Sequence, residues 1–128
     1  MEVHPEQARP CILLVEDDTA LRRALQLLLH GRGYEVRGYA TGARALAASA
    51  RVAPVCLVTD HCLTDMTSDE LLSRLRAAGC GCPAILITAD AAADRGDDVR
   101  WSPFQAVHRK PLTEHRLLAS VDRAVGRK

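Results

Sequence analysis

The segment 55–60 (VCLVTD) constrains the fold of this chain most strongly, because an almost entirely apolar run ends there on a carboxylate. A short apolar run without polar alternation is typical of a strand buried on both faces, as in a parallel sheet. The residues after Asp60 pass into a helical pattern, which fits a strand followed by a crossover helix. Ligands of such sheets bind beyond the carboxyl ends of the strands. We therefore expect Asp60 to lie at the ligand-binding edge of a parallel sheet.

Strand and helix patterns alternate along the rest of the chain. Further strands are predicted at residues 11–15, 34–39, 84–88 and 104–108, the second of them near a sheet edge because its apolar residues alternate. Capping residues precede the predicted helices at Asp18 or Thr19, at Thr41, at Thr67 or Ser68, and at Thr113. Residues 90–100 are a weak helix candidate, because their aspartates and glycine have low helix propensity. The pattern predicts a single α/β domain with a doubly wound sheet of five parallel strands.

Length and composition narrow the class of protein. The 128 residues fit one domain, predicted at residues 11–126 after a flexible N-terminal lead-in at residues 1–10. The formal net charge of +1 creates no field that recruits nucleic acid or an anionic membrane. No apolar run reaches membrane-spanning length, and the first residues lack the layout of a signal peptide. We therefore expect a cytoplasmic protein without membrane association.

The five cysteines, an odd number, fit a reducing compartment. Cys11 and Cys56 lie in apolar runs and are expected to behave as small core residues. The sequence Cys80-Gly81-Cys82 has the form of a metal hook, but no second Cys or His pair at zinc-finger spacing accompanies it. We expect this segment to be a loop with two free thiols.

Polar side chains follow four of the predicted strands. Glu16 and Asp17 follow the first, Asp60 ends the third, Thr88 ends the fourth and Lys110 follows the fifth. Because the carboxyl ends of parallel strands share one edge, these groups should converge. Three carboxylates in one pocket repel each other unless a cation lies among them, and Mg²⁺ is the hard divalent ion that suits such oxygen ligands. A lysine and a hydroxyl beside the metal predict a phosphoryl-transfer site with a carboxylate nucleophile.

The chain resembles the receiver domain of bacterial two-component response regulators over about residues 11–125. The resemblance rests on five motifs in order, namely ILLVEDD at 12–18, Gly33-Tyr34-Glu35-Val36, Asp60, Thr88-Ala89 and Lys110-Pro111. It implies a flavodoxin-like (βα)5 fold. It also implies a signalling module of a phosphorelay, which phosphorylates and dephosphorylates itself but is not a turnover enzyme.

The resemblance assigns a role to each residue at the sheet edge. Asp60 accepts a phosphoryl group from the phosphohistidine of a histidine kinase. Asp17, with Glu16, holds Mg²⁺, and the backbone carbonyl of Cys62 is a further ligand beside Asp60. Thr88 contacts the phosphoryl group, and Lys110 pairs with it. The bond between Lys110 and Pro111 is expected to be cis, as is typical of the family.

Three positions depart from the family pattern. Thr64 stands where the family usually has proline, and Ser68 where it usually has glycine, so a different path of the loop after Asp60 is expected. Val107 stands where the family has the aromatic residue that swings inward on phosphorylation. Val107 is too short for this movement, so the usual output surface on the fourth helix and fifth strand is expected to differ.

Other classes of protein also place a carboxylate at a strand end. A phosphotransferase of the haloacid dehalogenase type needs a second Asp two residues after the nucleophile, where this chain has Cys62. A flavodoxin-like flavin binder needs a phosphate-binding loop after the first strand, where Glu16 and Asp17 would repel the phosphate. A degenerate receiver, which acts as a phosphorylation-independent interaction module, remains the alternative. The intact set of carboxylates, threonine and lysine at the sheet edge argues against this alternative, whereas Thr64, Ser68 and Val107 argue for it.

The expected partners follow from the resemblance. Upstream, the receiver accepts phosphoryl groups from a sensor histidine kinase or a phosphotransfer protein. Because no DNA-binding domain follows Lys128, we expect a downstream protein partner and no direct binding of nucleic acid.

Overall fold

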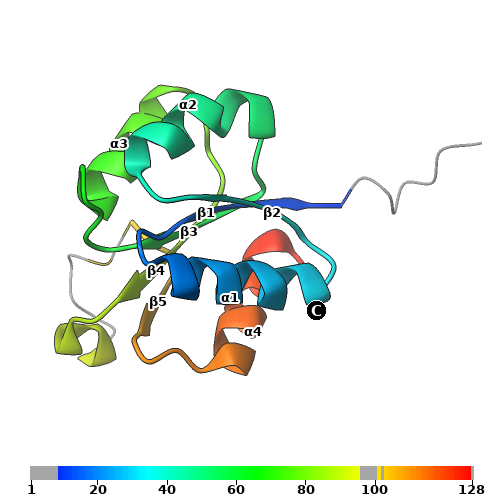
Figure 1. Ribbon diagram of the computed structural model, residues 1–128, viewed down its shortest axis with the longest axis vertical. Helices are drawn as coiled ribbons and strands as arrows, with labels where there is room; N and C mark the ends of the chain where they lie inside the picture. The colour runs from blue at the N-terminus through cyan, green and yellow to red at the C-terminus, as the bar shows by residue number, and fades with distance from the viewer. Residues whose placement is uncertain (1–8, 96–100, 102, 128) are drawn as a thin grey trace, which may run out of the picture.

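The fold is described from a computed structural model, which covers residues 9–95, 101 and 103–127. Five parallel strands form one sheet in the order β2-β1-β3-β4-β5. In Figure 1, α2 and α3 cover one face of this sheet, and α1 and α4 cover the other. This arrangement confirms the predicted doubly wound α/β fold. The strands are β1 Cys11–Val15, β2 Glu35–Tyr39, β3 Cys56–Asp60, β4 Ala84–Thr88 and β5 Ala106–Arg109, and the helices are α1 Thr19–Gly31, α2 Gly42–Val52, α3 Ser68–Ala77, the short 3₁₀ helix η2 Ala91–Arg95 and α4 Glu114–Val125.

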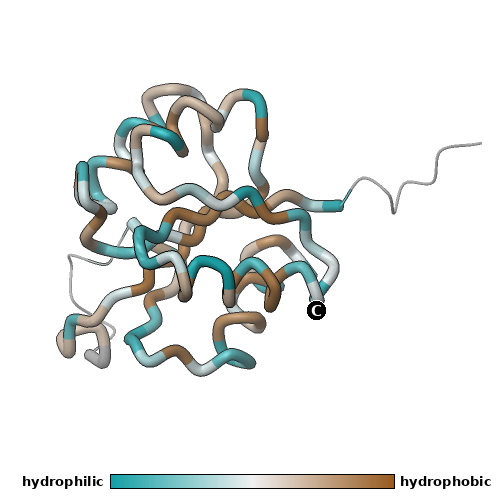
Figure 2. The backbone as a smooth tube through the Cα atoms, in the orientation of Figure 1, coloured by the Kyte–Doolittle hydropathy of each residue, from teal (hydrophilic) through white to brown (hydrophobic). Residues whose placement is uncertain are grey.

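The position of each strand in the sheet follows from its apolar pattern. Every residue of β3 and β4 is buried, as expected for central strands covered on both faces. Strand β2 lies at the edge and alternates between exposed and partly buried residues, which confirms the prediction from its sequence. Successive side chains of the inner strands point to opposite faces of the sheet and so belong to two separate cores. One core contains Leu13, Leu57 and Leu86, and the other contains Ile12, Val58 and Ile85. Figure 2 shows these strands as the hydrophobic layer between the helices.

Three of the predicted helix caps form hydrogen bonds. Side-chain oxygens of Asp18, Thr41 and Thr67 accept from backbone N–H groups three residues later, at 3.0, 3.2 and 3.2 Å. Each bond satisfies a donor that the first turn of a helix leaves unpaired. Thr113 occupies the corresponding position before α4 but makes no such bond. None of the helices in the described part of the chain is both long and apolar enough to cross a membrane.

The last predicted strand differs in detail from the structure. The last strand begins at Ala106 rather than at residue 104, because Phe104 is buried in the core before the strand pairs with β4. In the described part of the weak helix candidate, the 3₁₀ helix η2 forms at Ala91–Arg95, and residues 96–100 lie outside the described residues. Of the N-terminal lead-in predicted at residues 1–10, the structure describes Arg9 and Pro10, and the Pro10 carbonyl accepts a hydrogen bond of 2.9 Å from Glu35 N.

A buried carboxylate connects α4 by hydrogen bonds to the segment just before β2. Asp122 in α4 accepts hydrogen bonds from the Tyr34 hydroxyl and, at 2.6 and 2.9 Å, from the Arg32 guanidinium. Tyr34 is fully buried, and the Arg127 guanidinium lies 4.3 Å from its ring centroid. Burial and the negative charge of Asp122 raise the pKa of Tyr34 to about 12, so its hydroxyl remains a donor.

The Tyr34–Asp122 bond should be important for stability. We expect Tyr34→Phe to lower the free energy of unfolding by about 2 kcal/mol, because it removes a buried hydrogen bond to a charged group. Urea denaturation measures the change. Tyr39→Phe is the matched control, because the structure shows no side-chain hydrogen bond for Tyr39 among the described residues. Equal stability of Tyr34→Phe and wild type would contradict the assignment.

Candidate functional site

Three carboxylates meet at the carboxyl ends of β1 and β3. Glu16 and Asp17 directly follow β1, and Asp60 is the last residue of β3. One oxygen from each of the three lies within 4.8 Å of the others. Glu16 is fully buried and Asp60 is 9% exposed, whereas Asp17 is partly exposed. The convergence predicted from the strand ends is therefore present.

Lys110 lies between two of these carboxylates. Its Nζ is 3.2 Å from Glu16 Oε1 and 3.4 Å from Asp60 Oδ1. The backbone fixes this position, because Lys110 N donates to the Thr88 carbonyl at 2.8 Å. The bond between Lys110 and Pro111 is cis, as expected from the resemblance.

Thr88 ends β4 beside Asp60. In the register of β3 and β4, Asp60 lies opposite Ile87, so Thr88 extends one residue beyond it. Thr88 is buried, and its Oγ1 accepts a hydrogen bond of 3.1 Å from Asp90 N. The hydroxyl proton can still be donated to another group at this edge of the sheet.

The charges in the pocket are unbalanced, with three carboxylates facing one ammonium group. Burial is the largest cause that raises the pKa of Glu16 to about 7; the nearby Asp60 adds to the rise, while Asp18 N–H and Lys110 oppose it. Burial alone would lower the pKa of Lys110, but the negative charges of Asp60 and Glu16 outweigh it and raise that pKa. The pocket therefore favours an additional positive charge.

The residues present fit a hard divalent cation. Glu16 Oε2 accepts a hydrogen bond from Asp18 N at 3.1 Å, whereas the buried Oε1 receives none and has only the ion pair with Lys110. Among the described residues, no hydrogen bond reaches the carbonyl oxygen of Cys62, two residues beyond Asp60. Carboxylate and carbonyl oxygens are the ligands that Mg²⁺ takes in proteins. The acidic cluster is typical of the Mg²⁺ site of receiver domains.

The loop between β3 and α3 is tied to α2 by contacts that the sequence did not predict. Both carboxylate oxygens of Asp65 accept hydrogen bonds from the first N–H groups of α2, Gly42 N at 3.0 Å and Ala43 N at 2.9 Å. Met66 packs so closely on Gly42 that a Cβ there would lie 2.5 Å from its sulfur. The glycine at the start of α2 was the one sequence signal of this close approach. These contacts hold the segment that carries the Cys62 carbonyl.

The two departures in this loop are also accommodated by hydrogen bonds. Ser68 N donates to the His61 carbonyl at 2.9 Å, and Ser68 Oγ lies 3.2 Å from His61 Nδ1. Thr64 is exposed within a turn closed by a bond from Leu63 N to the Met66 carbonyl. The loop is therefore closed by backbone and side-chain bonds without a proline or a glycine at these positions.

An aromatic residue contacts His61, the residue that follows Asp60. Val107 is partly buried in β5 and packs on the core beneath α2 and α3. Trp101 is buried, and its ring meets the ring of His61 edge to face, with 5.4 Å between centroids. His61 N in turn donates to Asp60 Oδ1 at 2.8 Å. Asp60 is thus linked to Trp101 through one residue.

Comparison with known proteins identifies relatives of one kind. Residues 12–122 match the family described as the response regulator receiver domain. The transcriptional regulatory protein TrcR of Mycobacterium tuberculosis is 32% identical over 111 residues, which cover 80% of this chain and 43% of that protein. Response regulator MprA of Mycobacterium leprae is 35% identical over 101 residues, which cover 73% of this chain and 44% of that protein. This chain thus spans less than half the length of either relative.

A solved structure agrees with these sequence matches. The response regulator receiver domain protein (CheY-like) from Methanospirillum hungatei superimposes with a TM-score of 0.81 and 27% sequence identity, covering 92% of this chain and 94% of that chain.

Glu16 should make the metal-free protein less stable as the pH rises. Its pKa is about 7 in the folded protein against an ordinary value of 4.5, so between these values the folded state binds more protons than the unfolded state. The contribution of Glu16 to stability is therefore present in full below pH 4.5 and is lost as the pH rises through about 7. We expect wild type to fall progressively below Glu16→Gln in free energy of unfolding across this window.

Urea denaturation at fixed ionic strength, without divalent ions, measures this difference. Asp18→Asn removes a neighbouring exposed carboxylate and is the control for lost negative charge. Wild-type and Glu16→Gln curves that run parallel in pH would contradict the prediction.

Proposed function

Because the chain belongs to the family of response regulator receiver domains, we propose that Asp60 is the phosphoacceptor of a two-component phosphorelay. The observation that carries this proposal is the convergence of three carboxylates with Lys110 at one edge of the sheet. As a receiver, the chain is a signalling module rather than a turnover enzyme. The phosphorylated state is proposed to act on a downstream protein partner.

The proposed reaction is an in-line phosphoryl transfer. An oxygen of the Asp60 carboxylate attacks the phosphorus of a phosphohistidine on a histidine kinase or phosphotransfer protein. An O–P bond forms to Asp60, and the N–P bond breaks with its electron pair passing to the imidazole nitrogen. Water later attacks the same phosphorus, which releases inorganic phosphate and restores the carboxylate. Both steps mainly require positioning and the neutralisation of developing negative charge.

Two residues of the chain are proposed to stabilise the transferred group. Lys110, already 3.4 Å from Asp60 Oδ1, pairs with a phosphoryl oxygen. Thr88 donates its hydroxyl proton to another, which is consistent with a hydroxyl that accepts one bond and keeps its own proton free to donate. Each contact is absent before phosphorylation, so each favours the modified state.

Mg²⁺ is proposed to be held by the carboxylates of Glu16, Asp17 and Asp60 and by the carbonyl oxygen of Cys62. When bound, the ion supplies the positive charge that screens the carboxylates from each other and from the incoming phosphoryl group. The support is the buried Glu16 Oε1, which no hydrogen bond satisfies.

The bounds of the domain, its cellular location and its binding partners are also proposed. We place the domain at residues 11–126 and the protein in the cytoplasm, where histidine kinases present their phosphohistidine. No direct contact of this domain with nucleic acid or membrane is proposed. Relatives such as TrcR are named as transcriptional regulatory proteins, and this chain spans less than half their length, so the output of the whole protein is a separate question from the chemistry at Asp60.

Phosphorylation should occur at Asp60 alone. Intact mass after incubation with acetyl phosphate and Mg²⁺ should show one phosphoryl adduct, because among the described residues only Asp60 combines a strand-end carboxylate with an adjacent lysine and proposed metal ligands. Asp60→Asn should abolish the adduct. This variant should still unfold cooperatively in urea, as wild type does, which shows that it is folded. Asp69→Asn, which removes an exposed carboxylate at the start of α3, should retain it. A wild type that stays unmodified would favour the phosphorylation-independent interaction module instead.

Mg²⁺ should stabilise the fold through Asp17. A ligand that binds only the folded state stabilises it by RT ln(1 + [L]/Kd), about 2.7 kcal/mol at roughly 100-fold excess over Kd. Asp17→Ala should lose the Mg²⁺-dependent rise in melting temperature and should raise the melting temperature without Mg²⁺, because it relieves repulsion between carboxylates. Asp18→Asn should respond to Mg²⁺ as wild type does. An unchanged Mg²⁺ response of Asp17→Ala would rule out the assignment.

A further inference from the structure

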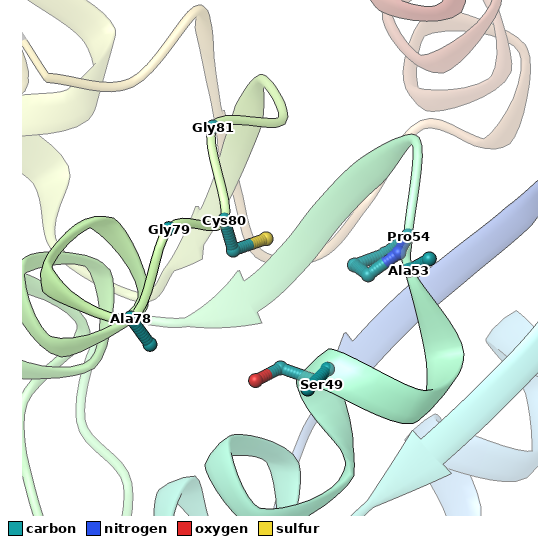
Figure 3. Close-up of a pocket in the computed structure, with 8 residues that line it drawn as sticks. Ser49, Ala53, Pro54, Ala78, Gly79, Cys80 and Gly81 are labelled. Carbon is teal, nitrogen blue, oxygen red and sulfur yellow. The ribbon is translucent and has the colours of Figure 1, made fainter.

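Two thiols lie next to each other in the loop between α3 and β4. The sulfurs of Cys80 and Cys82 are 3.6 Å apart, and both residues are partly buried against the core beneath α2 and α3. Figure 3 shows the Cys80 side chain pointing from this loop into a hollow beside the end of α2. The hollow has a volume of about 310 Å³ and is lined by Ser49, Ala50, Ala53, Pro54, Ala78, Gly79, Cys80 and Gly81. One sulfur of the pair is therefore accessible from this hollow.

The loop leaves room for the two sulfurs to approach. A disulfide requires the sulfurs to move from 3.6 Å to about 2.05 Å. Gly81 lies between the two cysteines, and a Cβ at Gly79 or at Gly81 would have no atom within 4 Å. The backbone that must adjust is therefore uncrowded at Gly79 and Gly81, and glycine can adopt a wider range of backbone conformations than other residues.

The two thiols differ in reactivity. Burial, and then the neighbouring Cys80, raise the pKa of Cys82 to about 12 against an opposing effect of Arg76. A reagent from solution therefore reacts slowly with Cys82 at neutral pH, because the thiolate is the attacking form. Attack of Cys82 on the Cys80 sulfur is intramolecular, and the separation of 3.6 Å offsets the small fraction of thiolate. Cys80 lines the hollow and Cys82 does not, so a reagent that enters the hollow meets the Cys80 sulfur first.

We propose that Cys80 and Cys82 are a reversible dithiol–disulfide pair, oxidised by small-molecule disulfides. The Cys80 thiolate attacks one sulfur of the reagent, forms a mixed disulfide and releases one thiolate. Cys82 then loses its proton to solvent and attacks the Cys80 sulfur, which forms the internal disulfide and expels the second thiolate. Two protein thiols and one small disulfide thus give one protein disulfide and two small thiols.

The pair lies at the opposite end of β4 from the phosphoacceptor site. Cys82 and Pro83 precede Ala84, the first residue of β4, whereas Thr88 at its other end lies beside Asp60. The proposal therefore does not rest on the proposed function. It adds a redox-responsive surface formed by the α3–β4 loop and the end of α2.

Peptide mapping tests the proposal directly. Trypsin cleaves after Arg76 and Arg95, and the peptide 77–95 contains Cys80 and Cys82 and no other cysteine. The full chain is incubated with oxidised glutathione, and free thiols are blocked with iodoacetamide. After trypsin digestion, the mass of the peptide is measured by mass spectrometry. We expect a mass lower by two hydrogen atoms with no alkyl group attached, and both sites alkylated after dithiothreitol treatment.

Single variants test the order of the steps. Cys82→Ser should accumulate a glutathione adduct on Cys80, because the resolving thiol is missing. Cys80→Ser should leave Cys82 largely without adduct. Two alkyl groups on the wild-type peptide, a glutathione adduct that does not proceed to the internal disulfide, or a disulfide-linked dimer through these residues would each overturn the proposal. Adduct formation at Asp60 with acetyl phosphate, measured on the oxidised protein, reports separately on the phosphoacceptor site.

Discussion

The organisation of the site depends on repulsion between carboxylates that the sheet holds together. Glu16, Asp17 and Asp60 place oxygens within 4.8 Å of one another, and Lys110 offsets only part of their charge. Such a cluster destabilises the fold unless a cation or a proton relieves it. Burial, and then the charge of Asp60, raise the pKa of Glu16 to about 7, which favours a proton on this carboxylate. The same unfavourable energy makes the pocket responsive, because any group that adds or removes charge there changes the stability of its surroundings.

The rest of the fold keeps these charges from separating. Glu16 follows a fully buried stretch of β1, its carbonyl accepts a 2.7 Å hydrogen bond from the Arg22 guanidinium of α1, and its N–H donates to the Tyr39 carbonyl of β2. Lys110 is tied to the Thr88 carbonyl by its backbone. The residues cannot relax apart without breaking sheet pairing or a helix contact. Parallel pairing is thus the constraint that brings the ends of four strands, β1, β3, β4 and β5, together at one reactive edge.

The sequence predicts the parts of this molecule that depend on local pattern and on strand direction. Apolar runs, helix caps and carboxylates at strand ends were sufficient to predict the doubly wound α/β fold class. They also predicted the convergence of Glu16, Asp60 and Lys110. Contacts that depend on the exact placement of loops had no local signal. Asp65 bonds to α2 from a loop more than twenty positions away, and Asp122 pairs with Tyr34 across most of the chain. The Cys80 and Cys82 thiols were expected to be free, but their separation of 3.6 Å followed only from the three-dimensional loop geometry.

The region around Val107 contains an aromatic contact to the residue after the proposed phosphoacceptor. A valine in β5 fills too little space to act as a moving aromatic group, and the ring that contacts His61 belongs to Trp101. Trp101 meets the ring of His61, whose backbone N–H binds the Asp60 carboxylate at 2.8 Å. A chemical change at Asp60 alters the acceptor of that hydrogen bond directly. Trp101 and Val107 both pack in the core beneath α2 and α3. Coupling in proteins requires contiguous contacts that have two alternative arrangements. In the described part of this chain, one such series of contacts runs from Asp60 through His61 to Trp101.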